Sequence, residues 1–139
     1  MLTAQLTQQL KSVQALQLLL EAETTCLKEK DFSQLNQLLF EKQKSLQAIA
    51  ELDKVLSTAS STEAIQQDTK LQTLKNEIES VLLVCKKINE VNGQLVQLSM
   101  KSNKHLMQLM KQATGKNSVT YDQKGMLNSG SLLGKNIKA

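Results

Sequence analysis

The chain has 139 residues, enough for one domain, and its lack of proline and tryptophan, with only 2% aromatic residues, is typical of helices joined by leucine seams. Its net charge of +4 is carried by lysine, because the chain has no arginine. Arginine is the side chain that binds phosphates and base edges through two parallel hydrogen bonds, so its absence argues against sequence-specific binding of nucleic acid.

The first half of the chain predicts two helical segments. The charged run at 28–31 separates a segment over residues 2–28 from a segment over residues 32–57. The apolar stripe of the second segment includes Leu52, or Asp53 by strict heptad spacing. The first half is therefore either two helices or one kinked helix. The stripe of the first segment recurs every seven residues, as in a coiled-coil seam, at Leu6, Val13, Leu20 and Leu27.

A single longer helix is predicted over residues 61–114, where apolar residues mostly alternate in steps of three and four. Ser60 and Glu63 have the spacing of a capping box at its start, and Gly115 can adopt the left-handed conformation that closes a helix. Such a rod cannot bury its apolar stripe against itself. It needs a partner of similar length, which the first half of the chain supplies across a polar connection at 57–62.

These patterns together predict an all-α protein. Residues 1–115 are expected to form a long antiparallel helical hairpin, or an elongated up-down bundle of three helices, followed by a flexible C-terminal tail at 116–139. In a hairpin that folds back near Ala59, residue i lies opposite residue 118 minus i. The position opposite Cys26 is then roughly 10 Å along the helix from Cys85, so we expect two buried thiols and no disulfide.

The sequence carries no sign of secretion or of insertion into a membrane. The N-terminus lacks a basic region followed by an apolar core, which is the mark of a secretion signal. No stretch reaches the ~18 consecutive apolar residues of a membrane span. We therefore expect a cytoplasmic protein without stable membrane insertion.

Residues that could carry out chemistry are sparse. The chain has one histidine, His105, and no cysteine at metal-ligand spacing from it. Gly125, Gly130 and Gly134 follow no predicted strand and precede no clear helix, which argues against a phosphate-binding loop. We therefore predict a protein that is not an enzyme and that needs no metal or cofactor.

The tail at 116–139 combines glycines with apolar side chains. Burying an apolar side chain stabilises by about 1.5–3 kcal/mol, whereas ordering the backbone costs about 1–2 kcal/mol per residue, so the tail should order only on a partner. The alternative is a frayed terminus. The apolar residues that would bind such a partner are Met126, Leu127, Leu132, Leu133 and Ile137.

Three methionines are a further candidate binding surface. Met100, Met107 and Met110 lie off the main leucine stripe near the end of the third predicted helix, and methionine adapts its shape to varied partners. The alternative is that these methionines pack on the first leucines of the chain, which the hairpin would bring to the same end: Leu2, Leu6 and Leu10.

The order of these parts resembles the FlgN-type flagellar export chaperones. The first matching features are an N-terminal helix rich in leucine and glutamine and the stretch Lys-Asp-Phe-Ser-Gln-Leu-Asn-Gln-Leu-Leu-Phe-Glu-Lys-Gln-Lys at 30–44. The long later helix follows, and then a tail in which Thr-Tyr-Asp at 120–122 precedes a glycine. The resemblance covers essentially the whole chain.

The resemblance implies a cytoplasmic, ATP-independent chaperone that binds hook–filament junction proteins, FlgK and FlgL, and presents them to the flagellar type III export gate. In the family the C-terminal region holds the substrate, a role that falls here on the tail, continued by Met107 and Met110. The linker tyrosine is implicated in docking to the gate protein FlhA, a role that falls here on Tyr121. The alternative is a structural or tethering coiled coil that forms homo-oligomers through its leucine stripes and has a dispensable tail.

Overall fold

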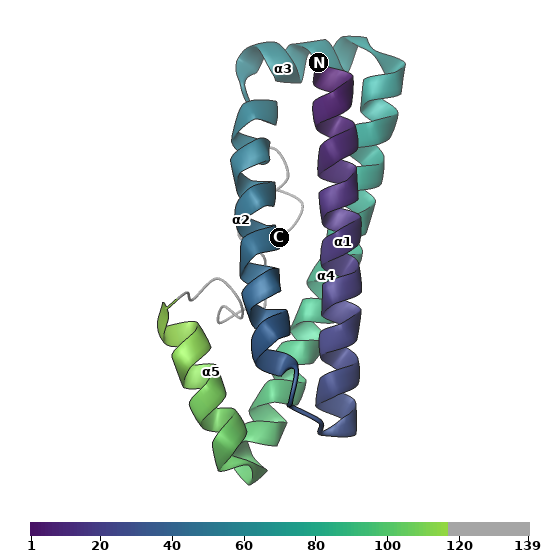
Figure 1. The fold of residues 1–139 in the computed structure, drawn as a ribbon. Coiled ribbons are helices and arrows are strands. Elements are labelled where there is room, and N and C mark those ends of the chain that lie inside the picture. The colour runs from purple at the N-terminus through teal and green to yellow at the C-terminus, as the bar shows by residue number, and fades with distance from the viewer. Residues whose placement is uncertain (117–139) are drawn as a thin grey trace.

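The computed structural model describes residues 1–116, and this part of the chain consists of helices and short connections (Figure 1). The prediction of an all-α fold is confirmed. The helices follow one another as α1 (Leu2–Glu29), α2 (Leu35–Leu56), α3 (Ala59–Gln67), α4 (Thr69–Ser102) and α5 (Lys104–Lys116).

α1 and α2 pack against each other as antiparallel neighbours (Figure 1). Near the start of α1, the Nε2 of Gln9 donates a hydrogen bond to the carbonyl oxygen of Ile49, 2.9 Å away. Near the end of α1, the carboxylate of Glu23 pairs with the ammonium of Lys42, 3.6 Å away. Because the later residue of α1 meets the earlier residue of α2, the two helices run in opposite directions.

α4 runs alongside α1 in the same direction, after α3 has crossed the end of the bundle near the N-terminus (Figure 1). The Sγ of Cys85 lies 3.7 Å from the carbonyl oxygen of Val13, and the Nδ2 of Asn92 donates to the carbonyl oxygen of Leu20 over 3.0 Å. Each contact joins residues 72 positions apart. α1 and α4 are therefore parallel, and α1 packs against both α2 and α4.

The long antiparallel hairpin predicted from the sequence is not formed, and the pairing of residue i with residue 118 minus i is wrong. The chain reverses after α1 instead of continuing as one arm. Lys30 takes the left-handed conformation, with a φ of 57°, and the N–H of Asp31 donates to the carbonyl of Cys26 over 3.1 Å. Asp31 Oδ1 also accepts hydrogen bonds from the backbone and hydroxyl of Ser33. This tight turn lays α2 on α1 and leaves another face of α1 for α4.

The helix predicted over 61–114 is divided into α3, α4 and α5, so the described chain has five helices where three were predicted. Asp68 has an extended backbone, and its Oδ1 caps α4 by accepting a hydrogen bond from the N–H of Lys70 over 2.9 Å. Asn103 caps α5 in the same way, because its Oδ1 accepts a hydrogen bond from the N–H of Leu106 over 3.0 Å. Short polar side chains bond to nearby backbone groups, which ends a helix without proline or glycine.

The ends of that predicted helix differ as well. α3 begins after Thr58, whose hydroxyl oxygen accepts a hydrogen bond from the N–H of Ser61 over 3.3 Å, so Ser60 and Glu63 do not form the expected capping box. At the other end, α5 continues through Gly115 to Lys116.

Two groups of buried side chains form the core, and both include residues of α1. The distal cluster joins the end of α1 to α2, α4 and α5, and consists of Leu27, Leu35, Leu39, Val96, Leu106 and Met110. The proximal cluster lies nearer the N-terminus and consists of Leu6, Val13, Leu16, Leu20, Leu46, Ile49, Leu56, Ile65, Leu71, Ile78, Leu82 and Cys85.

Both cysteines are free thiols, in agreement with the prediction of no disulfide. Cys85 is buried, which raises the pKa of its thiol to about 12, whereas Cys26 is half-buried. The expectation of two buried thiols is therefore met by Cys85 and not by Cys26. Among the helices described, none combines the length and the apolar character needed to cross a bilayer.

Ile78 tests the packing of α4, because it is fully buried in the proximal cluster. Ile78→Asp places an unpaired charge in this core and should lower the free energy of unfolding by about 3–5 kcal/mol. Thermal denaturation followed by circular dichroism measures the effect. Leu83→Asp, at a 44% exposed position of the same helix, is the matched control and should change the melting temperature little. An unchanged melting temperature for Ile78→Asp would show that this residue is not in the core.

Candidate functional site

α5 and the distal cluster hold the predicted site residues that the structure describes. α5 packs against α2 and α4 instead of extending α4 (Figure 1). Leu106 and Met110 of α5 are 0% and 3% exposed and belong to the distal cluster with Leu35 and Leu39 of α2. Met107 is half-buried.

The alternative packing of the methionines, on Leu2, Leu6 and Leu10, is wrong. Those leucines belong to or border the proximal cluster, whereas Met110 belongs to the distal cluster. The reason is the direction of α4, which carries its C-terminal end, and α5 with it, away from the N-terminus. In the free chain Met110 is thus a core residue, and Met107 is the one of the two that a partner can reach.

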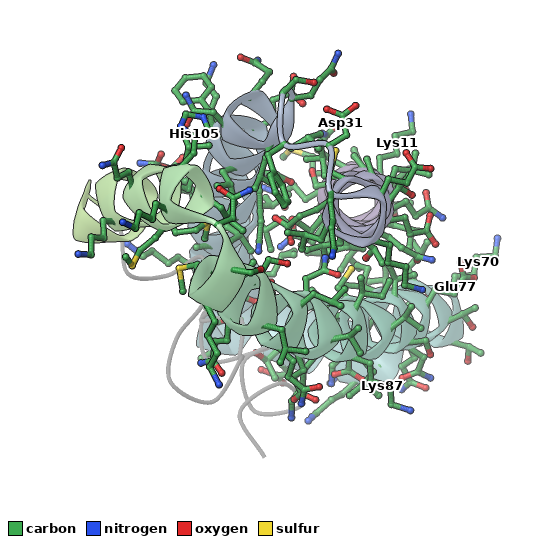
Figure 2. The ribbon with its side chains drawn as sticks, turned by 90° about the horizontal axis from the view of Figure 1, so that it is seen from below. Lys11, Asp31, Lys70, Glu77, Lys87 and His105 are labelled. Atoms are coloured by element: carbon green, nitrogen blue, oxygen red, sulfur yellow. The ribbon has the colours of Figure 1, made fainter. Side chains whose placement is uncertain are left out.

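The other predicted site residues lie outside the described part of the chain, so their roles stay predictions. His105 is exposed on α5 (Figure 2). Within residues 1–116, histidine, cysteine, aspartate and glutamate side chains form no group of three that could hold a metal ion. The site residues outside this range are Tyr121, Met126, Leu127, Leu132, Leu133 and Ile137.

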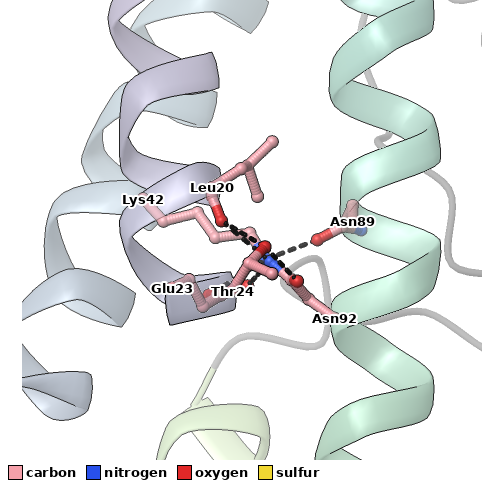
Figure 3. A network of polar contacts seen from close by, with 6 residues as sticks. All are labelled: Leu20, Glu23, Thr24, Lys42, Asn89 and Asn92. Carbon is pink, nitrogen blue, oxygen red and sulfur yellow. Dashed lines mark hydrogen bonds and ion pairs between the residues drawn. The ribbon is translucent and has the colours of Figure 1, made fainter. Parts of the chain in front are cut away.

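A layer of buried polar side chains separates the proximal from the distal cluster (Figure 3). Lys42 of α2 lies 3.6 Å from Glu23 of α1 and donates a hydrogen bond to Asn89 of α4. The Nδ2 of Asn92 donates to the Oε1 of Glu23 over 2.8 Å, and its Oδ1 accepts from the hydroxyl of Thr24. This polar layer therefore joins three helices in one network of Glu23, Thr24, Lys42, Asn89 and Asn92.

Burial determines what the polar layer does. The side chains of Glu23 and Lys42 are each 1% exposed, and loss of solvation lowers the pKa of Lys42 to about 8, although the attraction of Glu23 opposes this shift. Burial thus opposes the charge of Lys42, and apolar residues of the same volume would hold these helices together about as well or better. Lys42 and Asn92 meet their partners at this alignment of the helices, so the layer favours this register.

The amino-acid sequence also contains a signal for the polar layer, which the spacing of the leucines alone does not reveal. Glu23 and Lys42 each lie within an apolar seam, three positions after one seam residue and four positions before the next. At this spacing the helical repeat predicts an apolar residue. Charges of opposite sign in the seams of two neighbouring helices indicate a buried pair. Asn89 and Asn92 likewise lie within the buried stripe of α4.

A protein-family model covers most of the chain. The model described as FlgN protein matches residues 1–129. The matched range includes all five helices and extends past Tyr121 and Leu127. No curated protein and no solved structure matches the chain.

Removing one member of the Glu23–Lys42 pair should be more harmful than replacing both. Glu23→Leu or Lys42→Met leaves a buried charge without its ion-pair partner and should cost about 3–5 kcal/mol, whereas the double variant should be neutral or more stable by about 1–4 kcal/mol. Urea denaturation of the four proteins measures these free energies of unfolding.

The control for this cycle is the partly exposed pair of Lys75 and Glu79, which lie 3.8 Å apart on α4. Solvent screens this pair, so its own double-mutant cycle should give a coupling of under about 0.5 kcal/mol. The double variant could instead lose as much free energy of unfolding as the Glu23 and Lys42 single variants lose together. That result would show that the two side chains are not coupled.

Proposed function

Because this chain belongs to the FlgN family, whose members are flagellar export chaperones, we propose that it is a cytoplasmic, ATP-independent chaperone of hook–filament junction proteins. It binds a FlgK- or FlgL-like protein and delivers it to the type III export gate. The family match over residues 1–129 carries this proposal. The packed helical scaffold supports it, since such a scaffold offers surfaces to other proteins.

The substrate contacts of this proposal fall on the tail and on α5. A substrate helix with an apolar stripe packs on the apolar side chains of the tail, which pays its ordering cost on binding. Met107 is half-buried and continues this surface. Met110 is 3% exposed in the described chain, so its contact with a substrate would require α5 to separate from α2. The tail residues assigned to the substrate are Met126, Leu127, Leu132, Leu133 and Ile137.

Docking to the export gate, a FlhA-like protein, is assigned to Tyr121. The matched range of the FlgN family model includes this residue. A tyrosine suits such a role, because it offers a large apolar ring together with a hydroxyl group that can form a hydrogen bond. Substrate binding and gate docking then use different residues of the same tail.

A structural or tethering coiled coil is the second candidate function. It is favoured by apolar side chains on the surface of α4, where Val84, Val91 and Leu98 are 42%, 47% and 64% exposed. The two functions differ in what they require of residues 117–139. A chaperone of the proposed kind needs this segment for binding, whereas a tether does not.

Tyr121→Ala tests gate docking. The change should weaken binding to a purified FlhA-like gate domain and leave binding to the junction protein unchanged. The melting temperature should stay the same, since a surface substitution is usually worth under ~0.5 kcal/mol. Gln123→Ala, two residues along, is the control and should bind the gate normally. A loss of thermal stability in Tyr121→Ala would remove this residue from the docking site.

Leu132→Ala combined with Leu133→Ala tests the substrate contacts. The double variant removes about 2–5 kcal/mol of apolar burial, which should weaken binding to a purified junction protein by tens to thousands of times. Calorimetric titration measures the affinity. Lys135→Ala is the control, because an apolar contact is not screened by salt and should not depend on this charge. Normal binding by the double leucine variant would place the substrate contacts elsewhere.

A further inference from the structure

α4 carries two apolar seams, one inside the core and one that runs along the edge of the core. The inner seam is buried and includes two polar residues, Asn89 and Asn92. The other seam, here called the outer seam, has no polar residue over a span of roughly 27 Å of helix. Its members are Val81, Val84, Ile88, Val91, Leu95 and Leu98.

The spacing of the outer seam is that of a coiled coil. Its residues follow one another in alternating steps of three and four, so Val81, Ile88 and Leu95 take the a positions of a heptad repeat, and the other three take the d positions. The a residues are half-buried along the core, whereas the d residues are exposed. A seam that is more apolar than the buried seam beside it indicates a surface that another helix covers.

We propose that the outer seam is covered by the outer seam of a second copy of this chain, with the two α4 helices antiparallel across a two-fold axis. In an antiparallel coiled coil the a residues of one helix meet the d residues of the other. Pairing residue i with residue 179 minus i matches all six members, because it joins an a residue to a d residue at every level. The resulting pairs are Val81 with Leu98, Val84 with Leu95, and Ile88 with Val91.

The charges beside the outer seam favour this direction. Glu77 and Lys87 lie on the outside of α4 (Figure 2). The antiparallel pairing puts Glu77 opposite Ser102 and Lys87 close to Gln94 of the second copy, so no like charges meet. A parallel pairing in register puts Glu77, the d position that precedes Val84, against Glu77 of the other copy, which is repulsive.

An exposed leucine on α1 lies at the level of the proposed axis. The pairing places the axis between residues 89 and 90, and the offset of 72 positions between α1 and α4 brings Leu18 to this level. Leu18 is 68% exposed. The two-fold axis brings the leucines of both copies to the same height along the pair of α4 helices.

The mass of the chain in solution tests this proposal. Light scattering after gel filtration, over a range of concentrations, should give about 31 kDa, twice the 15.4 kDa of one chain. Val84→Lys with Val91→Lys should halve this mass. Leu83→Lys is the matched control, since Leu83 is 44% exposed beside Val84 but lies off the seam, and it should keep the dimer. A single-chain mass for the unaltered protein, or a dimer that survives both seam lysines, would overturn the proposal.

Two further measurements keep the test decisive. If the double lysine variant is unfolded by circular dichroism, Leu98→Lys, at a 64% exposed position, replaces it with the same expected outcome. Direction is tested by oxidation in a background of Cys26→Ser and Cys85→Ala. Glu77→Cys mixed with Ser102→Cys should form a mixed disulfide dimer, whereas cross-linking of Glu77→Cys to itself would overturn the antiparallel arrangement. The chain is measured alone, so the result is independent of the proposed chaperone function.

Discussion

The burial of α1 on two faces is the constraint on which the rest of the structure depends. α2 covers one face in the antiparallel direction, and α4 covers the other in the parallel direction (Figure 1). Because both partners pack on α1, each of the two core clusters includes side chains of α1, α2 and α4. α2 and α4 also meet directly, through the hydrogen bond from Lys42 to Asn89. The direction of α4 then decides where α5 lies, and hence where the chain leaves the described scaffold.

The spans of the first helices could be predicted from the sequence, whereas their arrangement could not. The repeat of apolar residues identifies the face that a helix buries, and it does so in detail, since the strict heptad residue Asp53 is buried while Leu52 is half-buried. An apolar stripe carries no information on the direction of its partner. That direction follows from the reversal after α1, where Lys30 adopts a left-handed conformation for which sequence rules expect glycine.

The candidate site could be predicted in composition but not in placement. Helical spacing puts Met107 and Met110 off the leucine stripe, yet the cap at Asn103 turns α5 back onto α2 and buries Met110. This outcome depends on a tertiary contact that no local pattern encodes. The sequence shows that Glu23 and Lys42 are charged residues within two apolar seams. It does not show that they pair, because the pairing requires α1 and α2 to be neighbours. The binding role of the tail rests on composition, which predicts order on a partner without naming the partner.

The most direct test of the chaperone function is to titrate a purified FlgK- or FlgL-like junction protein into the full chain and into a chain that ends at Lys116. The shorter chain retains all five helices, and circular dichroism verifies that it is folded. Isothermal titration calorimetry should give a saturable heat of binding with the full chain and none with the shorter chain. Binding of equal affinity by both chains, or by neither, would contradict the proposed function.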